Sequence, residues 1–143
     1  MRVLAIDVGR RRVGLAISDP SRTLARPLAT ILVTPADLVE RIAGEIGRLA
    51  AEDDGVGEIV VGLPVRLDGS PNEQTAYVSA FIAALRARTV IPILTEGERL
   101  TSREADSRLA ATERDWRKRK AHLDAAAAAV ILQDYLDRRT QAS

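Results

Sequence analysis

The sequence predicts an α/β fold in which a mixed sheet is covered by helices, and two patterns support this prediction. Short apolar runs of strand length alternate with segments whose apolar residues recur at helical spacing. The first two apolar runs are joined through Gly9-Arg10-Arg11-Arg12, which is typical of a β-hairpin with glycine at the tight point. The predicted order is three strands, then helix, strand, helix, strand and two helices, with no internal repeat and no linker. We therefore expect one domain that spans residues 1–143.

The composition narrows the classes of protein to which the chain can belong. Apolar residues make up 46% and charged residues 29%, which is typical of a globular protein. Cysteine is absent and histidine occurs once, which excludes disulfides, thiolate chemistry and histidine-rich metal clusters. No stretch has the length of a membrane span, and the first residues lack the apolar core of a signal peptide. These features predict a cytoplasmic protein without a membrane partner.

The amino-terminal hairpin is the stretch around which the chain is organised. Residues 3–8 form a nearly continuous apolar run, as expected of a central strand buried on both faces. Asp7 interrupts this run, and an unpaired carboxylate is costly to bury. A bound cation would offset that cost, and Gly9 would let a ligand approach the backbone. The alternative is that Asp7 accepts hydrogen bonds from a loop or pairs with an arginine.

The next elements are a strand and a helix. Pro27 marks the start of a third strand, Arg26–Val33. Thr34 is expected to cap a helix whose first residue is proline and which covers Pro35–Ala51. Its apolar residues at helical spacing are Leu38, Ile42, Ile46 and Leu49.

The second half of the chain continues the alternation of strands and helices. A short buried strand at Glu58–Leu63 leads into a turn-rich loop, and Val90–Thr95 forms a fifth strand that Pro92 keeps away from the centre of the sheet. The expected helices are one with Val78, Phe81, Ile82 and Leu85 on one face, one that begins at Thr101, and a final one from about Leu123 to Arg138.

Three carboxylates, Asp7, Glu98 and Asp124, stand where we expect them to converge. Glu98 directly follows the fifth strand, and Asp124 opens the last helix on its core-facing stripe. Strand ends and a helix start can meet at one end of an α/β sheet, which is where ligands usually bind. The alternatives are a solvated loop residue for Glu98 and a carboxylate facing the helix dipole for Asp124.

An all-oxygen cluster favours a hard cation, Mg²⁺ or Mn²⁺. Two such ions about 3.5–4 Å apart can activate a water and stabilise the leaving oxygen of a phosphodiester. A hydrolase acting on ester bonds of nucleic acid is therefore the leading interpretation.

A basic segment just before Asp124 fits such a substrate. Residues 114–120 carry five positive charges against one negative, around Trp116. We expect Lys118, Arg119 and Lys120 to bind nucleic-acid phosphates. The alternative is a solvated charged surface.

The chain resembles the YqgF/RuvX family of small bacterial proteins with an RNase H-like fold. The matching motifs are Asp7-x-Gly9-x-Arg11-x-x-Gly14-x-Ala16, Ala25-Arg26-Pro27-Leu28, Val60-Val61-Gly62-Leu63-Pro64 with Asp68-Gly69-Ser70, Glu98-Arg99-Leu100-Thr101-Ser102, and Lys120-x-x-x-Asp124-x-x-Ala127-Ala128 followed by Ile131-Leu132-Gln133-x-Tyr135-Leu136. They cover nearly the whole chain in order.

The resemblance implies a five-stranded mixed sheet, its first three strands antiparallel, with helices on both faces. It implies that Asp7, Glu98 and Asp124 hold the divalent metal and act in catalysis. It also implies that Gly9, Arg11, Arg99, Thr101 and the basic residues before Asp124, Lys120 in particular, face substrate. The implied role is processing of the 5′ end of pre-16S rRNA during ribosome biogenesis.

One position departs from the family pattern. An acidic residue usually precedes the motif glutamate, and here that position is Gly97. Glu96 would replace it in part if its side chain points to the same side as that of Glu98. We expect the incomplete charge to favour Mn²⁺ over Mg²⁺.

Three other functions compete with an RNA nuclease. A DNA endonuclease that resolves four-way junctions is suggested by the related fold, and branched or single-stranded DNA would then be the substrate. Such an enzyme would favour a homodimer, and the sequence leaves monomer and homodimer open. A non-catalytic RNA-binding assembly factor would not need three carboxylates. A sugar kinase or actin-like ATPase needs two such domains, which 143 residues cannot supply.

Overall fold

The computed structural model describes residues 1–64, 70–98 and 116–142, apart from the side chains of residues 98, 116–123, 141 and 142. Its strands are β1 (Arg2–Val8), β2 (Arg12–Ser18), β3 (Ala25–Leu32), β4 (Val56–Pro64) and β5 (Ile93–Glu98). The helices in the described part are α1 (Leu38–Ala50), α2 (Glu73–Arg86) and α4 (Trp116–Ala142).

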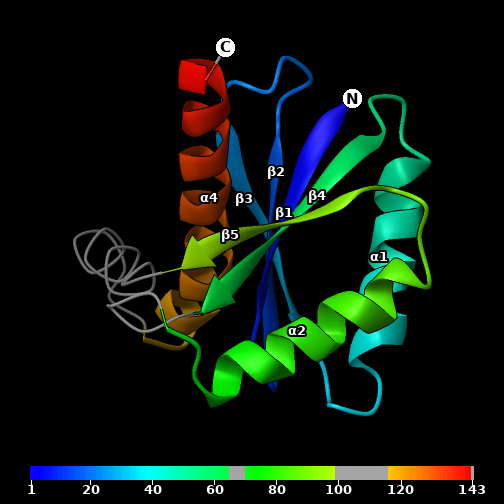
Figure 1. Cartoon of the computed structure of the whole chain (residues 1–143), viewed down its shortest axis with the longest axis vertical. Coiled ribbons are helices and arrows are strands. Elements are labelled where there is room, and N and C mark those ends of the chain that lie inside the picture. The colour runs from blue at the N-terminus through cyan, green and yellow to red at the C-terminus, as the bar shows by residue number, and fades with distance from the viewer. Residues whose placement is uncertain (65–69, 99–115, 143) are drawn as a thin grey trace.

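The strands form a mixed five-stranded sheet in the order β3-β2-β1-β4-β5 (Figure 1). β1 pairs antiparallel with β2, and β2 pairs antiparallel with β3. β4 lies parallel to β1, and β5 lies parallel to β4. The predicted α/β fold is confirmed, with the first three strands antiparallel and β5 at an edge of the sheet.

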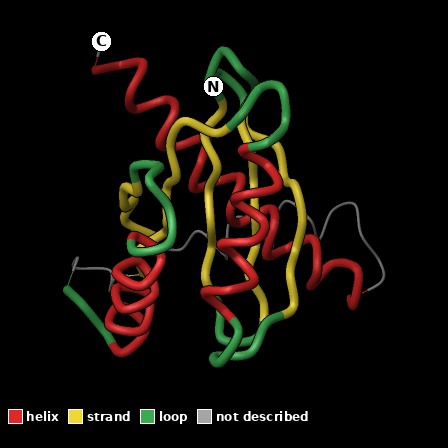
Figure 2. Tube along the Cα trace, turned by 90° about the vertical axis from the view of Figure 1, so that its right-hand side faces the viewer, coloured by secondary structure: helices red, strands yellow, loops and turns green. Residues whose placement is uncertain are grey.

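Helices cover both faces of the sheet, and the alternation of side chains along β1 builds two cores. Leu4 and Ile6 belong to the larger core, which includes buried residues of α1 and α2. Val3 and Ala5 point to the other face, where they pack against buried residues of α4. Figures 1 and 2 show α4 on one side of the sheet and α1 on the other. We call these two sides the α4 face and the α1/α2 face.

The first helix begins one turn later than the sequence predicts. It starts at Leu38, because Thr34 and Asp37 close a turn by reciprocal hydrogen bonds. The Asp37 carboxylate accepts from the Thr34 N–H at 2.6 Å, and the Thr34 hydroxyl accepts from the Asp37 N–H at 3.2 Å. The prediction that Thr34 caps a helix at Pro35 was wrong, because threonine and proline serve a turn as well as they serve a helix start.

Two later boundaries also differ from the prediction. The fifth strand is Ile93–Glu98 instead of Val90–Thr95, because strand pairing starts only after Pro92. Glu98 is therefore the last residue of the strand. The last helix starts at Trp116, so the basic residues that follow Trp116 belong to α4. The helix predicted from Thr101 lies outside the described residues.

Candidate active site

Asp7 lies near the carboxyl end of the central strand, on the α4 face of the sheet. It is partly buried, and it shares its face with Val3 and Ala5 because alternate residues of a strand point the same way. Its partner across the antiparallel pair is Gly14. On its other side, the parallel register that pairs Ile6 with Val61 continues to Gly62. Asp7 thus stands between two residues without side chains, so neither neighbouring strand places a side chain directly beside its carboxylate.

Gly14 also determines how closely α4 approaches this point. A β-carbon added at Gly14 would lie 1.9 Å from the backbone oxygen of Asp124 and 3.0 Å from the nitrogen of Ala125. Any larger residue would therefore collide with the helix. Since directly opposed residues of an antiparallel pair lie about 4.5–5.5 Å apart, the same contact brings the backbone of Asp124 next to Asp7.

Asp124 faces a countercharge from β2. Its Oδ2 lies 4.0 Å from Nη1 of Arg12, and both side chains are about a third exposed. Because α4 begins at Trp116, Asp124 lies in the third turn of the helix and not at its start. The helix dipole acts mainly within the first turn, so it does not account for this carboxylate.

Gly14 and Arg12 were not predicted as site residues from the residues alone. The signal at Gly14 was present in the sequence, because an isolated glycine in an apolar strand often marks the close approach of another backbone. Arg12 could not be separated from its neighbours Arg10 and Arg11 by sequence.

β5 carries two glutamates, Glu96 and Glu98. Glu96 pairs with Gly62, so it lies on the same face as Asp7, and the backbone of Glu98 pairs with Pro64. The side chain of Glu98 lies outside the described residues. Gly14, Asp7, Gly62 and Glu96 form one row across four strands, with Asp124 above its first member.

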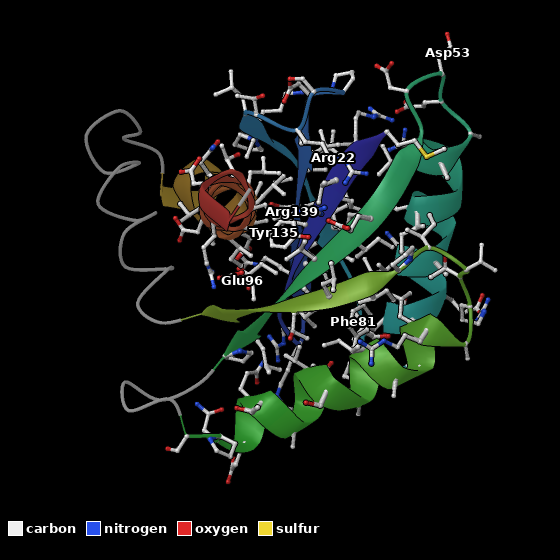
Figure 3. All side chains as sticks on the ribbon, turned by 45° about the horizontal axis from the view of Figure 1, so that its top comes forward. Arg22, Asp53, Phe81, Glu96, Tyr135 and Arg139 are labelled. Carbon is white, nitrogen blue, oxygen red and sulfur yellow. The ribbon has the colours of Figure 1, made fainter. Side chains whose placement is uncertain are left out.

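Glu96 is already engaged by α4. Only 7% of the residue is exposed, and its carboxylate forms an ion pair with Arg138. In Figure 3 its side chain lies between β5 and α4. Arg138 is roughly 20 Å further along the helix than Asp124, at 1.5 Å per residue. The buried carboxylate is therefore balanced by an arginine at the far half of α4.

Position 97 faces away from the candidate site. Gly97 pairs with Leu63, which packs against the core of the α1/α2 face. A β-carbon added at Gly97 would meet nothing within 4 Å. An aspartate at this position would thus fit the strand, but in a regular strand it would point to the opposite face from Asp7.

A polar cluster at the other end of α4 holds the helix on the sheet. The Glu58 carboxylate on β4 accepts hydrogen bonds from the Tyr135 hydroxyl and, at 2.5 Å, from Nη1 of Arg139, and Nη1 of Arg22 lies 3.9 Å away (Figure 3). Burial and the neighbouring Glu58 raise the pKa of Tyr135. The Gln133 side chain adds hydrogen bonds to β3 and the loop before it. These contacts fix the orientation of α4 and hence the place of Asp124.

The hairpin places arginines at the sheet edge beyond Asp7. The Gly9 N–H donates to the carbonyl of Arg12 at 2.9 Å, and a β-carbon at Gly9 would lie 2.6 Å from that same oxygen. Glycine is therefore needed for the turn. Arg10 and Arg11 are exposed at its tip.

The donors fit a hard divalent cation. The contact at Gly14 brings the backbone of Asp124 next to Asp7, and both residues offer oxygen ligands. Among the described residues, no three histidine, cysteine, aspartate or glutamate side chains form a metal cluster. For the third predicted ligand, Glu98, the structure describes the backbone but not the side chain.

The other predicted substrate residues are only partly described. Lys118, Arg119 and Lys120 lie in the first turns of α4, just before Asp124, and their side chains are outside the described part. Arg99 and Thr101 lie outside it altogether.

In the described ranges, no helix is long and apolar enough to cross a membrane.

Comparison with known proteins gives a consistent picture. A family model described as "RuvX: Holliday junction resolvase" matches residues 1–138. A protein of Chloroflexus aggregans named "Putative pre-16S rRNA nuclease" is 44% identical over 137 residues, which cover 96% of this chain and 94% of that protein. A protein of the same name from Maridesulfovibrio salexigens is 42% identical, with 96% and 99% covered.

Solved structures share the fold at low sequence identity. The fowlpox virus resolvase, solved with Holliday junction DNA, gives a TM-score of 0.59 at 11% identity and covers 97% of this chain and 99% of its own. Thermus thermophilus RuvC, solved with a Holliday junction, gives 0.55 at 17% identity, with 98% and 96% covered. The fold is the RNase H-like fold of the resolvases, here with carboxylates at the carboxyl edge of its central strand. The chain belongs to the RuvX family.

Proposed function

We propose that this protein is a divalent-metal-dependent nuclease that hydrolyses phosphodiester bonds in RNA and processes the 5′ end of pre-16S rRNA. The observation that carries the proposal is the contact at Gly14, which sets Asp124 beside Asp7 at the edge where the hairpin presents Arg10 and Arg11. The relatives named pre-16S rRNA nucleases support the choice of substrate.

The candidate site residues divide into metal ligands and residues that bind substrate phosphates. Asp7, Glu98 and Asp124 would hold Mg²⁺ or Mn²⁺, which supplies activation of a water and stabilisation of charge on the leaving oxygen. Arg12, whose Nη1 lies 4.0 Å from the Asp124 carboxylate, would help to orient this ligand. Arg11 and the basic start of α4 would bind phosphates on either side of the scissile bond.

A second candidate function is cleavage of DNA four-way junctions. The description of the matching family model favours it. It makes the same demands on the carboxylates and differs in the substrate, which would be branched DNA.

One experiment separates these possibilities. The purified protein is incubated with labelled precursor 16S rRNA, single-stranded RNA, single-stranded DNA and a four-way junction, each with Mg²⁺, Mn²⁺ or chelator. We expect metal-dependent cleavage of precursor rRNA near its mature 5′ end. Cleavage of the junction alone would establish the second function, and binding of RNA without cleavage in any substrate–metal combination would indicate an assembly factor.

The basic start of α4 should contribute electrostatically to binding. We expect the triple variant Lys118→Ala, Arg119→Ala, Lys120→Ala to lower the magnitude of the log–log salt slope of RNA affinity by roughly 0.7–0.9 for each phosphate that the protein no longer neutralises. The effect should be similar for unrelated sequences, because phosphate contacts do not read bases. Fluorescence anisotropy across a salt series measures the slope.

A charge-matched control tests whether the position of the charges matters. Arg26→Ala, Arg48→Ala, Arg88→Ala removes the same charge from the start of β3, the last turn of α1 and the segment after α2, none of which lies at the hairpin edge of the sheet. This control should keep the wild-type slope. Equal slopes in both triple variants would show that the basic start of α4 is a solvated surface.

The glutamates of β5 should differ sharply in their effect on cleavage. We expect Glu98→Gln to lower the cleavage rate far more than Glu96→Gln, because Arg138 already neutralises Glu96. If Glu96 is not a ligand, only Asp7, Glu98 and Asp124 remain to hold two ions. Cleavage activity with Mn²⁺ should then exceed that with Mg²⁺ at equal concentration, because Mn²⁺ tolerates a less regular set of ligands. Gly97→Asp should fold normally and keep that preference, since position 97 faces the α1/α2 side.

Titrating both ions against wild type and the three variants measures these differences. Equal losses in the two glutamine variants would mean that Glu96 is a ligand after all. A shift toward Mg²⁺ in Gly97→Asp would mean that the strand turns before Glu98.

A further inference from the structure

Arg10 at the tip of the hairpin is held against an aromatic ring. Its guanidinium carbon lies 4.5 Å from the centroid of the Tyr77 ring on α2. The arginine is exposed, and no ion pair in the described part of the chain involves it. Its charge is therefore fixed in place without being neutralised.

The ring that holds Arg10 is itself firmly placed. Tyr77 is partly buried against the core of the α1/α2 face, and its hydroxyl oxygen is fully buried. One turn earlier on α2, the Gln74 side chain donates to the carbonyl of Val8 at 3.4 Å. The hairpin is thus attached to α2 at two points, at Val8 before Gly9 and at Arg10 after it.

This arrangement suits the binding of a phosphate. A guanidinium stacked on a ring has given up most of its rotational freedom before any ligand arrives, and its N–H groups stay accessible in its own plane. Phosphate oxygens match that planar fork of donors. A stacked arginine without a carboxylate partner, at the rim of a candidate nuclease site, meets these requirements.

We propose that Arg10, oriented by Tyr77, binds a backbone phosphate of the nucleic-acid substrate on the α1/α2 side of the sheet edge. The proposal rests on the proposed nuclease function. The candidate carboxylates lie on the α4 face, whereas Tyr77 belongs to the opposite face. The substrate strand would therefore pass over the hairpin tip from one face of the sheet to the other, with Arg10 holding the part that has left the site.

The test uses the Asp7→Asn background, in which nothing should be cleaved, and a fluorescent single-stranded RNA. Arg10→Ala should weaken binding and lower the magnitude of the salt slope by roughly 0.7–0.9, as expected when one phosphate is no longer neutralised. Arg26→Ala removes an exposed arginine of β3 that pairs with Ile17 at the opposite end of the sheet, and this matched control should leave the slope unchanged. Arg10→Ala with the slope of that control would overturn the proposal.

Tyr77 is a positioning residue, and a double-mutant cycle tests this role. Tyr77→Leu should weaken binding in the presence of Arg10 and have no further effect in the Arg10→Ala protein, because the ring acts only through the arginine. Tyr77→Phe keeps the ring and should bind as wild type, which separates the effect of the ring from that of the hydroxyl group. Additive effects of Tyr77→Leu and Arg10→Ala would overturn the orienting role.

The outcomes also separate this inference from the proposed function. RNA binding that depends on Arg10, in a protein that cleaves no substrate, would overturn the nuclease proposal and leave the phosphate site standing. A wild-type protein that binds neither RNA nor junction DNA would overturn both.

Discussion

Asp7→Asn is expected to abolish metal-dependent cleavage while the chain stays folded. The loss should be on the order of 10⁴-fold, as for residues that act as part of one catalytic unit. Without metal, the free energy of unfolding should be equal to or slightly above that of wild type, because removing one charge relieves repulsion between Asp7 and Asp124. Single-turnover cleavage with Mn²⁺ and thermal unfolding in chelator measure the two effects.

A matched substitution controls for the loss of a carboxylate as such. Asp53 is exposed in the loop after α1, on the far side of the molecule from the candidate site (Figure 3). Asp53→Asn should cleave as wild type does. Wild-type turnover in Asp7→Asn would remove Asp7 from the set of ligands and with it the two-metal interpretation.

Gly14→Ala is expected to damage both stability and activity. Its β-carbon would lie 1.9 Å from the Asp124 backbone, so α4 must move away from β2. Overpacking of this kind costs typically about 1–3 kcal/mol in the free energy of unfolding. Because the same movement displaces Asp124 from Asp7, the folded fraction should also lose most of its cleavage rate. Urea unfolding and cleavage assays report the two losses separately.

The same substitution at Gly44 is expected to stabilise the protein instead of destabilising it. Gly44 lies inside α1, and a β-carbon there would meet nothing within 4 Å. Alanine should stabilise this helix by roughly 0.5–1 kcal/mol and leave cleavage unchanged. Wild-type stability and activity in Gly14→Ala would contradict the close contact between α4 and β2.

The sequence predicts those parts of the fold that follow from local patterns. The apolar run around Ile6 indicated the central strand, and the helical spacing of Ile42 and Ile46 indicated α1. The start of α1 was wrong because Thr34 can close a turn or cap a helix with equal ease. The predicted start of α4 was wrong because charged residues such as Lys118 show no apolar periodicity, although they are compatible with a helix.

The candidate site depends more on tertiary contacts, which local patterns do not contain. The sequence identified Asp7 and Asp124 as unusual, but not the contact at Gly14 that brings them together. The role of Glu96 could not be assigned either, because its partner Arg138 comes from a helix distant in sequence. The sequence left the direction of the Glu96 side chain open, and only the packing of α4 shows that its charge is already balanced.

Direct measurement of metal binding tests the central claim, that Asp7 and Asp124 together hold a divalent ion. Mn²⁺ is titrated into wild type, Asp7→Asn, Asp124→Asn and the control Asp53→Asn, and free ion is followed by electron paramagnetic resonance without any nucleic acid. We predict that wild type and Asp53→Asn bind Mn²⁺ with the same affinity, and that Asp7→Asn and Asp124→Asn each weaken binding at least about tenfold, which corresponds to roughly 1.4 kcal/mol. Equal affinity in all four proteins would contradict the claim.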